Sequence, residues 1–299
     1  MKIGVKTALA LALAVVAIST SGPLIAFAAA PALALAFWRN ALATTVLVPA
    51  AVVTRRDELR ALWQGRELRW SVLAGLALAV HFATWMAGAQ LTAVATATAL
   101  AATQPVWAGL ISFWQGRRPN RAMWLGIAAA VGGVVLITGA DLGGSRQALL
   151  GDLLALVGGM SAAVYTVFGE RARARASTTS HTTVCYAVCA AVLGLGCVVA
   201  RVPLSGYAVS TWLAILGLTV GTQLLGHSMF NYALHEMSAT AVSVLVMLEV
   251  PGAAFISWAW LGQNPAPLAW AGIALLVSGV AFVIIGSARE RPVPVDPSL

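Results

Sequence analysis

The chain consists mostly of long apolar stretches separated by short polar connections. The stretches are continuously apolar and do not alternate with polar residues, which favours helices over membrane-spanning strands. About 20 apolar residues are enough to cross the hydrocarbon core of a bilayer as a helix that satisfies its own backbone hydrogen bonds. We predict ten such stretches, at about residues 5–27, 31–53, 70–90, 92–114, 121–140, 149–169, 182–200, 208–232, 238–261 and 266–286.

The second half of the chain repeats the first at a fixed offset of 146 residues. No gap is needed from about Gly75 to about Val134. The aligned pairs include Pro105 with Pro251, Gly116 with Gly262, Trp114 with Trp260, Gly126 with Gly272, Gly133 with Gly279 and His81 with His227. An internal duplication in an apolar chain is typical of transporters, in which two repeats build one shared site at their interface.

Each predicted repeat contains five helices, and this odd number has a consequence for orientation. The second repeat must start on the opposite side of the membrane from the first, so the two are inverted about an axis in the membrane plane. We therefore predict an all-α membrane protein with ten transmembrane helices in two inverted five-helix repeats, residues 1–146 and 147–288. Residues 289–299 contain three prolines and are predicted to form a disordered cytoplasmic tail.

Composition and charge agree with a membrane location. Hydrophobic residues make up 60% of the chain and charged residues 9%, against about 25% charged residues in an ordinary soluble domain. The net charge of +8 does not indicate nucleic acid binding, because the basic residues lie in the short connections. With a cytoplasmic N-terminus, fifteen Lys and Arg residues face inward and only Arg146 and Arg201 face outward. The positive-inside rule then predicts a multi-pass protein of the cell (inner or plasma) membrane with both termini cytoplasmic.

The first stretch also has features of a secretory signal peptide. Lys2 and Lys6 precede an apolar core, and alanines cluster at residues 26–30. Against this alternative, the second half has a matching stretch near residues 152–168, and cleavage would leave one repeat incomplete. The three cysteines, Cys185, Cys189 and Cys197, share one apolar stretch without metal-ligand spacing, so we interpret them as packing residues.

Two repeated segments carry a resemblance to a known family. The first, residues 92–120, reads TAVATATALAATQPVWAGLISFWQGRRPN, and the second, residues 238–265, reads SATAVSVLVMLEVPGAAFISWAWLGQNP. Each has a run of small residues, a proline, about ten apolar residues and a glycine turn. In this layout the chain resembles the drug/metabolite transporter superfamily, in its ten-helix EamA-like branch. The resemblance covers essentially the whole chain and implies export of small organic metabolites such as amino acids or drug-like compounds.

The chain departs from the family pattern at three places. The acidic residue usual after the turn glycine is Arg117 in the first repeat and Gln263 in the second. The tryptophan-glycine pair common in the first helix is replaced by residues 18–23, ISTSGP. These departures leave the expected fold intact. They argue against inferring the substrate of this chain from that of any one protein of the family.

The sequence lacks the motifs of an enzyme. It contains no HExxH, GxSxG or Walker motif, and no GxGxxG after a strand. We therefore expect no catalytic residues, no metal and no cofactor, and any active transport must use an ion or solute gradient.

Four ionisable residues lie deep within the predicted helices: Arg39, His81, His227 and Glu249. Such residues usually face a protein interior or a wet cavity. Glu249 precedes Pro251 by two residues, and it is a candidate for proton coupling or for binding a substrate amine. The alternative is a structural glutamate bonded to a neighbouring helix. Arg39 is a candidate for holding a substrate carboxylate or phosphate or for pairing with Glu249, and the alternative is a structural pair or a carbonyl clamp.

The two histidines occupy equivalent positions in the repeats, which predicts a symmetric pair beside a central cavity. Gln223, His227 and Asn231 are spaced by four residues and are predicted to share one helix face, as are His81 and Trp85. A polar face of this kind is unfavourable against lipid. The alternative to cavity lining is hydrogen bonding between helices.

Symmetry fails at the residues beside the two prolines. Gln104 and Trp107 flank Pro105, and Thr103 is the counterpart of Glu249. Asymmetric positions are better candidates for substrate choice than symmetric ones, which serve the fold. Trp85 and Trp107 could stack on an apolar or aromatic ligand, although most such tryptophans pack or anchor helices at the interface.

Together these patterns predict a secondary transporter that works by alternating access around a polar cavity at the membrane midplane. The predicted substrate-binding residues are Arg39, His81, Trp85, Gln104, Trp107, Gln223, His227, Asn231 and Glu249. Glu249 is the first candidate for a proton carrier and His227 the second. The expected partners are a small-molecule substrate, the lipid bilayer and, as a candidate, protons; no nucleic acid is expected. The alternatives are an uncoupled facilitator or channel and a membrane scaffold without transport, and the sequence gives no oligomeric state.

Overall fold

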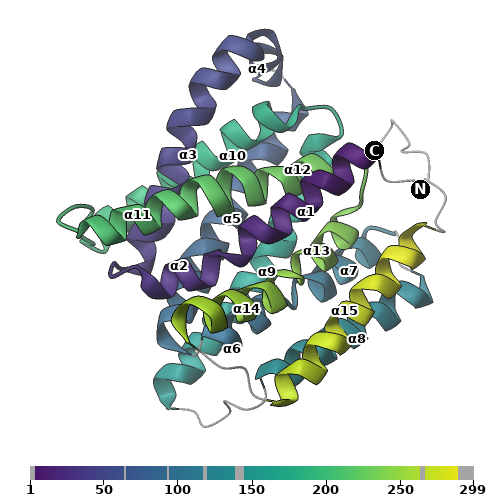
Figure 1. The fold of residues 1–299 in the computed structure, drawn as a ribbon. Helices are drawn as coiled ribbons and strands as arrows, with labels where there is room; N and C mark the ends of the chain where they lie inside the picture. Colours follow the sequence, from purple (N-terminus) through teal and green to yellow (C-terminus); the bar gives the residue numbers. More distant parts are fainter. Residues whose placement is uncertain are drawn as a thin grey trace.

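The computed structural model describes residues 4–63, 65–92, 94–116, 120–138, 145–262 and 267–288, and within these ranges every regular element is a helix (Figure 1). The all-helical prediction is therefore confirmed for the described part of the chain. The predicted tail, residues 289–299, and the turn residues Arg117 and Gln263 lie outside the described residues.

The elements follow one another along the whole chain. They are α1 (Val5–Ser19), α2 (Ser21–Phe27), α3 (Ala32–Thr54), α4 (Arg56–Leu62), α5 (Arg66–Leu91), α6 (Val94–Ala101), α7 (Gln104–Trp114), α8 (Arg121–Thr138), α9 (Arg146–Arg173), α10 (Thr178–Val199), α11 (Val209–Gly217), the π-helix η1 (Leu218–His227), α12 (Ser228–Ala233), α13 (Ala239–Val246), α14 (Glu249–Leu261) and α15 (Pro267–Ala288).

Each predicted apolar stretch coincides with one helix or with a series of consecutive helices. Among the described residues, seven helical stretches are long and apolar enough to cross a membrane. Two further apolar helices, Arg121–Leu136 and Trp270–Phe282, are shorter. The short helix α4 was not predicted, and it forms within the arginine-rich connection after α3.

Four of the stretches are interrupted near their middle, and each interruption has a local chemical cause. Between α1 and α2, the hydroxyl of Ser19 donates to the Val15 carbonyl and that of Thr20 to the Ala17 carbonyl, a back-bonding that bends helices. The breaks between α6 and α7 and between α13 and α14 lie beside Pro105 and Pro251, because proline lacks the amide donor of a continuous helix.

The fourth interruption is the π-helix η1, a ten-residue segment with wide i to i+5 turns. Its end is held by the backbone carbonyl of Gln223, which accepts hydrogen bonds from the amide of Ser228 and from the hydroxyls of Ser228 and Tyr186. π-Helical turns of this kind are rare and often occur at functional sites.

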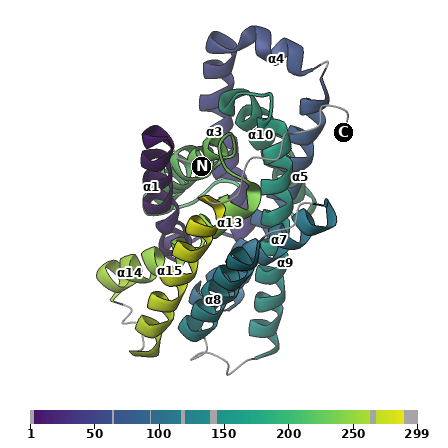
Figure 2. The ribbon, with the colours of Figure 1, turned by 90° about the vertical axis from the view of Figure 1, so that its right-hand side faces the viewer.

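Neighbouring helices pack in a few extensive pairs. Helix α5 lies against α9, α3 against α10, α1 against η1, and α8 against α15 (Figures 1 and 2). The α8–α15 pair is joined through glycines. A Cβ atom at Gly133 would lie 2.5 Å from the carbonyl oxygen of Gly272, and one at Gly279 would lie 2.5 Å from that of Gly126. Larger side chains would therefore force these two helices apart.

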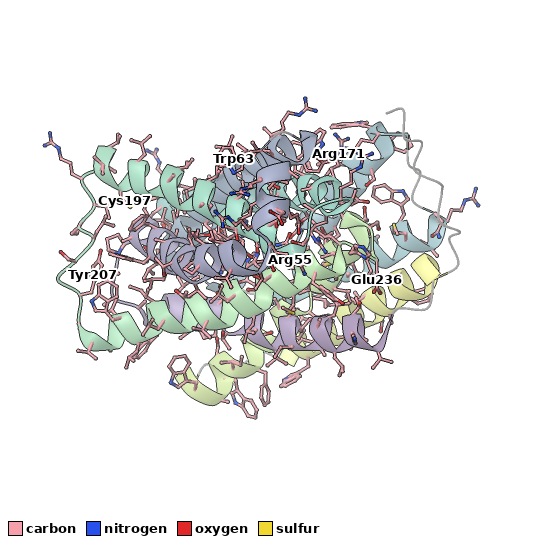
Figure 3. All side chains as sticks on the ribbon, turned by 90° about the horizontal axis from the view of Figure 1, so that it is seen from above. Arg55, Trp63, Arg171, Cys197, Tyr207 and Glu236 are labelled. Atoms are coloured by element: carbon pink, nitrogen blue, oxygen red, sulfur yellow. The ribbon has the colours of Figure 1, made fainter. Side chains whose placement is uncertain are left out.

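Side-chain contacts between helix ends occur at two opposite ends of the molecule. At one end, Glu236 accepts from the Gly4 amide, and Arg175 pairs with Glu67 at 3.8 Å. At the other, Gln90 bonds the backbone of residues 30 and 32, and Trp38 donates to the Leu204 carbonyl. Figure 3 shows Cys197 and Tyr207 at the opposite end of the molecule from Arg171 and Glu236. The N-terminal end of α1 and the C-terminal end of α15 lie on the same side of the molecule (Figure 1).

Candidate functional site

A small cavity lies where the interrupted helices meet. Its volume is about 50 Å³, room for about three to five water molecules. The wall combines polar and apolar side chains from α1, α5, α6, α7, α9, η1, α12, α13 and α14. The polar residues are His81, Trp85, Thr98, Gln104, Tyr165, Thr166, His227, Asn231 and Glu249; the apolar ones are Ile18, Ala101, Ala102, Ala162, Phe230, Leu234, Val242, Val246 and Val250.

The cavity brings together six of the nine residues predicted from the sequence: His81, Trp85, Gln104, His227, Asn231 and Glu249. The other three, Arg39, Gln223 and Trp107, are not in its wall. Both halves of the chain contribute, so the site is shared between the two sequence repeats.

The two equivalent histidines lie close together, with ring centroids 6.4 Å apart. Nδ1 of His81 is 2.9 Å from the Gly158 carbonyl oxygen. Because a carbonyl only accepts, Nδ1 carries the proton and Nε2 is left as an acceptor. The His81 ring also stacks on Trp85, with centroids 5.7 Å apart and planes 3° from parallel.

Asn231 stands at the position equivalent to Trp85 in the other repeat. Its amide nitrogen donates to the hydroxyl of Tyr165 and to the His227 carbonyl, but its Oδ1 has no hydrogen-bond partner. The indole nitrogen of Trp85 is likewise buried without a partner. Oδ1 of Asn231 lies beside Gly169 and Nε2 of His181, which are outside the cavity wall, so it does not match the unused donor of Trp85 across the cavity.

Arg39 belongs to a buried polar network beside the cavity. Its Nε donates to Oε1 of Gln223 at 2.9 Å, and Nε2 of Gln223 donates to Oδ1 of Asn40 at 3.0 Å. The guanidinium carbon lies 4.2 Å from the centre of the Phe82 ring, within cation–π range. Nη1 and Nη2 of Arg39 have no partner, although the side chain is completely buried.

Gln223 is not in the cavity wall, because its side chain is bonded to Arg39 and Asn40 of α3. A separation of four residues keeps side chains on nearly the same face in a π-helix as in an α-helix, and both His227 and the guanidinium of Arg39, the partner of Gln223, lie against Phe82. Of the three residues predicted to share a face, only His227 and Asn231 are in the cavity wall.

Glu249 begins α14 and lies in the cavity wall, and its buried Oε1 has no hydrogen-bond partner. Its counterpart in the other repeat, Thr103, donates to the Leu100 carbonyl and accepts from the indole of Trp107. Both hydrogen bonds of the Thr103 hydroxyl are thus made within the same predicted stretch. The bond from Trp107 keeps that indole out of the cavity wall. The asymmetry seen in the sequence becomes a difference between a satisfied hydroxyl and an unsatisfied carboxyl.

Gln104 has a different role from the other polar groups, because its amide is committed to protein partners. Nε2 donates to the hydroxyls of Thr166 at 2.9 Å and Ser243 at 2.8 Å. These bonds join α7, α9 and α13 at the edge of the cavity.

Unpartnered buried polar atoms are concentrated at this site. In the described part of the chain they occur on Trp85, Thr98, Asn231 and Glu249 in the cavity wall and on Arg39 beside it, and elsewhere on Thr7, Asp152 and His181. Buried polar groups are normally hydrogen-bonded. A cluster that is not bonded indicates a place for water or a ligand.

Sequence reasoning missed several residues of the site: Thr98, Tyr165, Thr166, Ser243 and Phe82. Tyr165 and Thr166 are adjacent polar residues within an apolar stretch, and that signal could have been used. Phe82 carries no polar signal. Among the described residues no group of three or more His, Cys, Asp or Glu side chains could hold a metal ion, and the three cysteines are free and buried.

Comparisons with known proteins agree with this architecture. The model of the EamA-like transporter family matches residues 5–139 and again residues 149–285. A "probable terminal-alkyne amino-acid exporter" from Streptantibioticus cattleyicolor is 28% identical over 210 residues, covering 67% of this chain and 68% of that protein. The "uncharacterized transporter YwfM" of Bacillus subtilis is 24% identical over 250 residues, covering 78% and 81%.

The fold is also found among solved structures. One, described only as a protein crystal structure, has a TM-score of 0.77 at 21% sequence identity and covers 95% of this chain and 98% of its own. This likeness concerns the fold alone.

Proposed function

The chain belongs to the EamA-like transporter family, and from that premise we propose that it is a secondary transporter exporting small zwitterionic metabolites, amino acids above all. Transport proceeds by alternating access around the cavity. The observation that carries the proposal is the set of unpartnered donors and acceptors gathered in one cavity between the repeats.

We propose ten spans in two inverted five-helix repeats, residues 1–146 and 147–288. The glycine contacts of α8 and α15 support this. Gly126 meets Gly279 and Gly133 meets Gly272, so the contacts run in opposite order along two helices that are equivalent in sequence. Equivalent helices of opposite direction are what inversion requires. The pairs α5–α9 and η1–α1 likewise correspond when the repeats are exchanged.

We also propose that both termini are cytoplasmic, in the cell membrane. The excess of basic residues on that side supports this orientation. The contacts between helix ends also agree with it. Gly4 contacts Glu236 and Glu67 pairs with Arg175, and this orientation assigns all four residues to the cytoplasmic side.

The size of the cavity favours a moving site over an open channel. Room for a few waters does not admit a metabolite unless the surrounding helices separate. The interruptions at Thr20, Pro105 and Pro251 and in η1 lie in helices that line the cavity, and discontinuous helices commonly form the binding sites of transporters.

The unpartnered polar groups of the cavity wall are suited to a zwitterion, a molecule with one positive and one negative charge. Oε1 of Glu249 is an acceptor for an ammonium group, and the indole nitrogen of Trp85 and the hydroxyl of Thr98 are donors for a carboxylate. The field of Arg39 favours the carboxylate end. The aliphatic wall of Ile18, Val242, Val246 and Val250 is left for an apolar side chain. The name of the Streptantibioticus relative agrees with this class of substrate.

Counterflow in proteoliposomes tests the proposal. Vesicles loaded with an unlabelled aliphatic amino acid should take up the labelled compound, whereas the matched amine and the matched carboxylic acid, each lacking one charge, should exchange at least tenfold more slowly. Equal exchange of all three compounds would contradict a zwitterion site. Flux that follows the solute gradient alone, with no proton movement, would select the uncoupled facilitator instead.

A further inference from the structure

The short helix α4 is a fixed structure at the end of α3. Oε1 of Glu58 accepts a hydrogen bond from the amide of Ser177, at the start of α10, and Leu62 is buried. Burial raises the pKa of Glu58, but the hydrogen bonds from Ser177 outweigh that effect and leave the pKa below its ordinary value of 4.5. The carboxylate therefore stays charged at neutral pH and ties α4 to Ser177, the residue that precedes α10.

The opposite side of α4 is exposed and carries arginine and tryptophan. Arg56 and Arg60 are one helical turn apart on this side, and both are exposed. Trp63 follows with 71% of its surface exposed, and Val53 precedes the helix with 82% exposed. Two large apolar side chains this exposed would be unfavourable in water.

The helix α4 follows a candidate span directly, so it lies near the edge of the bilayer if Ala32–Thr54 crosses the membrane. Figure 2 shows α4 lying across the ends of α3, α5 and α10 rather than along them. The candidate span Ala32–Thr54 ends two residues before α4 begins. A short helix at the end of a spanning helix, with exposed basic and aromatic side chains, is suited to the membrane interface.

The acidic residues nearby leave the exposed side positive. Glu58 is turned inward to Ser177, and Glu67 pairs with Arg175 at 3.8 Å. Asp57 lies 3.8 Å from Arg60, with 98% of its side chain exposed, and an ion pair this exposed contributes little. Arg55, Arg56 and Arg60 thus outnumber the one carboxylate that faces outward.

We propose that α4 binds anionic phospholipid headgroups, with Arg56 and Arg60 on the phosphates and Trp63 and Val53 at the boundary with the acyl chains. A soluble anion would use the arginines but not the apolar side chains, and an apolar partner would not use the arginines. A lipid surface uses both. The proposal depends on the membrane placement of Ala32–Thr54 and is independent of what the cavity carries.

The test is thermal unfolding of the full-length protein in detergent, titrated with phosphatidylglycerol or phosphatidylcholine. Phosphatidylglycerol should raise the unfolding temperature more than phosphatidylcholine does. The variant Arg56→Gln/Arg60→Gln should need about thirtyfold more phosphatidylglycerol for the same shift, about fivefold for each arginine. The control Arg146→Gln/Arg201→Gln removes the same charge from the other predicted side and should respond like the wild type.

Three further comparisons complete the test. Arg56→Lys/Arg60→Lys keeps the charge and should keep most of the response, and added salt should weaken the response of the wild type. An unchanged response in Arg56→Gln/Arg60→Gln, or equal shifts from the two lipids, overturns the proposal. Equal stabilisation by glycerol 3-phosphate also overturns it, because the partner would then be a soluble anion.

Discussion

Replacement of Glu249 by glutamine is expected to lower the affinity for a zwitterionic substrate by about thirtyfold or more. Glu249 is the only carboxylate in the described cavity wall, and its Oε1 has no protein partner. Loss of one member of a buried charge pair typically weakens binding by about 2 kcal/mol or more. Glutamine keeps the size and one acceptor but removes the charge. Isothermal titration calorimetry with the purified protein measures the change.

The substrate analogue without its amine supplies the control. If the carboxylate of Glu249 binds the ammonium group, the deaminated analogue should bind equally weakly to wild type and variant. Stability separates this effect from misfolding. Glu249→Gln removes the charge that compensates Arg39, so a lower unfolding temperature is expected, but a single cooperative transition shows that the variant is folded. A substrate affinity that does not change would exclude Glu249 from the site.

The same variant addresses coupling. If Glu249 carries the proton, transport by Glu249→Gln should lose its dependence on pH and on the proton gradient. His227→Gln should retain that dependence. If Glu249→Gln keeps the pH dependence of the wild type and His227→Gln loses it, the role passes to the histidine, which also lies in the cavity wall.

The second large effect is expected for the pair Arg39 and Glu249. Nη1 and Nη2 of Arg39 and Oε1 of Glu249 are all buried without hydrogen bonds, and opposite charges on the two groups would attract strongly in an interior of low dielectric constant. Arg39→Gln removes the compensating charge and the donor to Gln223. We expect it to lower the unfolding temperature strongly, because breaking a buried pair costs about 3–5 kcal/mol.

A double-mutant cycle isolates this interaction. Arg39→Gln/Glu249→Gln should be more stable than Arg39→Gln alone, with a coupling energy of roughly 0.5–3 kcal/mol. Thermal unfolding in one detergent measures all four proteins of the cycle. Additive effects would mean that the two charges do not interact and that the instability of Arg39→Gln comes from Gln223. Arg39→Lys keeps the charge but not the planar fork, so it should resemble the wild type more than Arg39→Gln does.

Much of the architecture could be predicted from the sequence, because long apolar stretches have only one stable form in lipid. The predicted stretches coincide with the helices of the structure. The repeat predicted His81 and His227 at symmetric positions on either side of a central cavity, and both are in the cavity wall with ring centroids 6.4 Å apart. The family model confirms the predicted family. It matches the chain twice, which also confirms the two-repeat architecture.

The details of the site could not be predicted, for reasons specific to each residue. Gln223 was predicted to line the cavity, but its side chain is bonded to Arg39 and Asn40, and helical spacing does not reveal which polar partner a buried side chain takes. Trp107 was predicted to line the cavity because it lies close to Pro105. Its indole N–H instead donates a hydrogen bond to the hydroxyl of Thr103, and Trp107 is not in the cavity wall. Tyr165 and Thr166 come from a helix whose match to the first repeat is imprecise, so the offset that identified His227 gave no indication of them. The number of spans, their inversion and the roles of the site residues stay predictions.

Side-specific labelling of the cavity tests the central claim most directly. The protein is reconstituted with Val246→Cys, a cavity position, in a background where Cys185, Cys189 and Cys197 are alanine. A membrane-impermeant maleimide should modify the thiol from either side of the bilayer, and bound substrate should slow both reactions. A thiol that reacts from neither side, or at the same rate with and without substrate, would contradict a shared cavity that opens alternately.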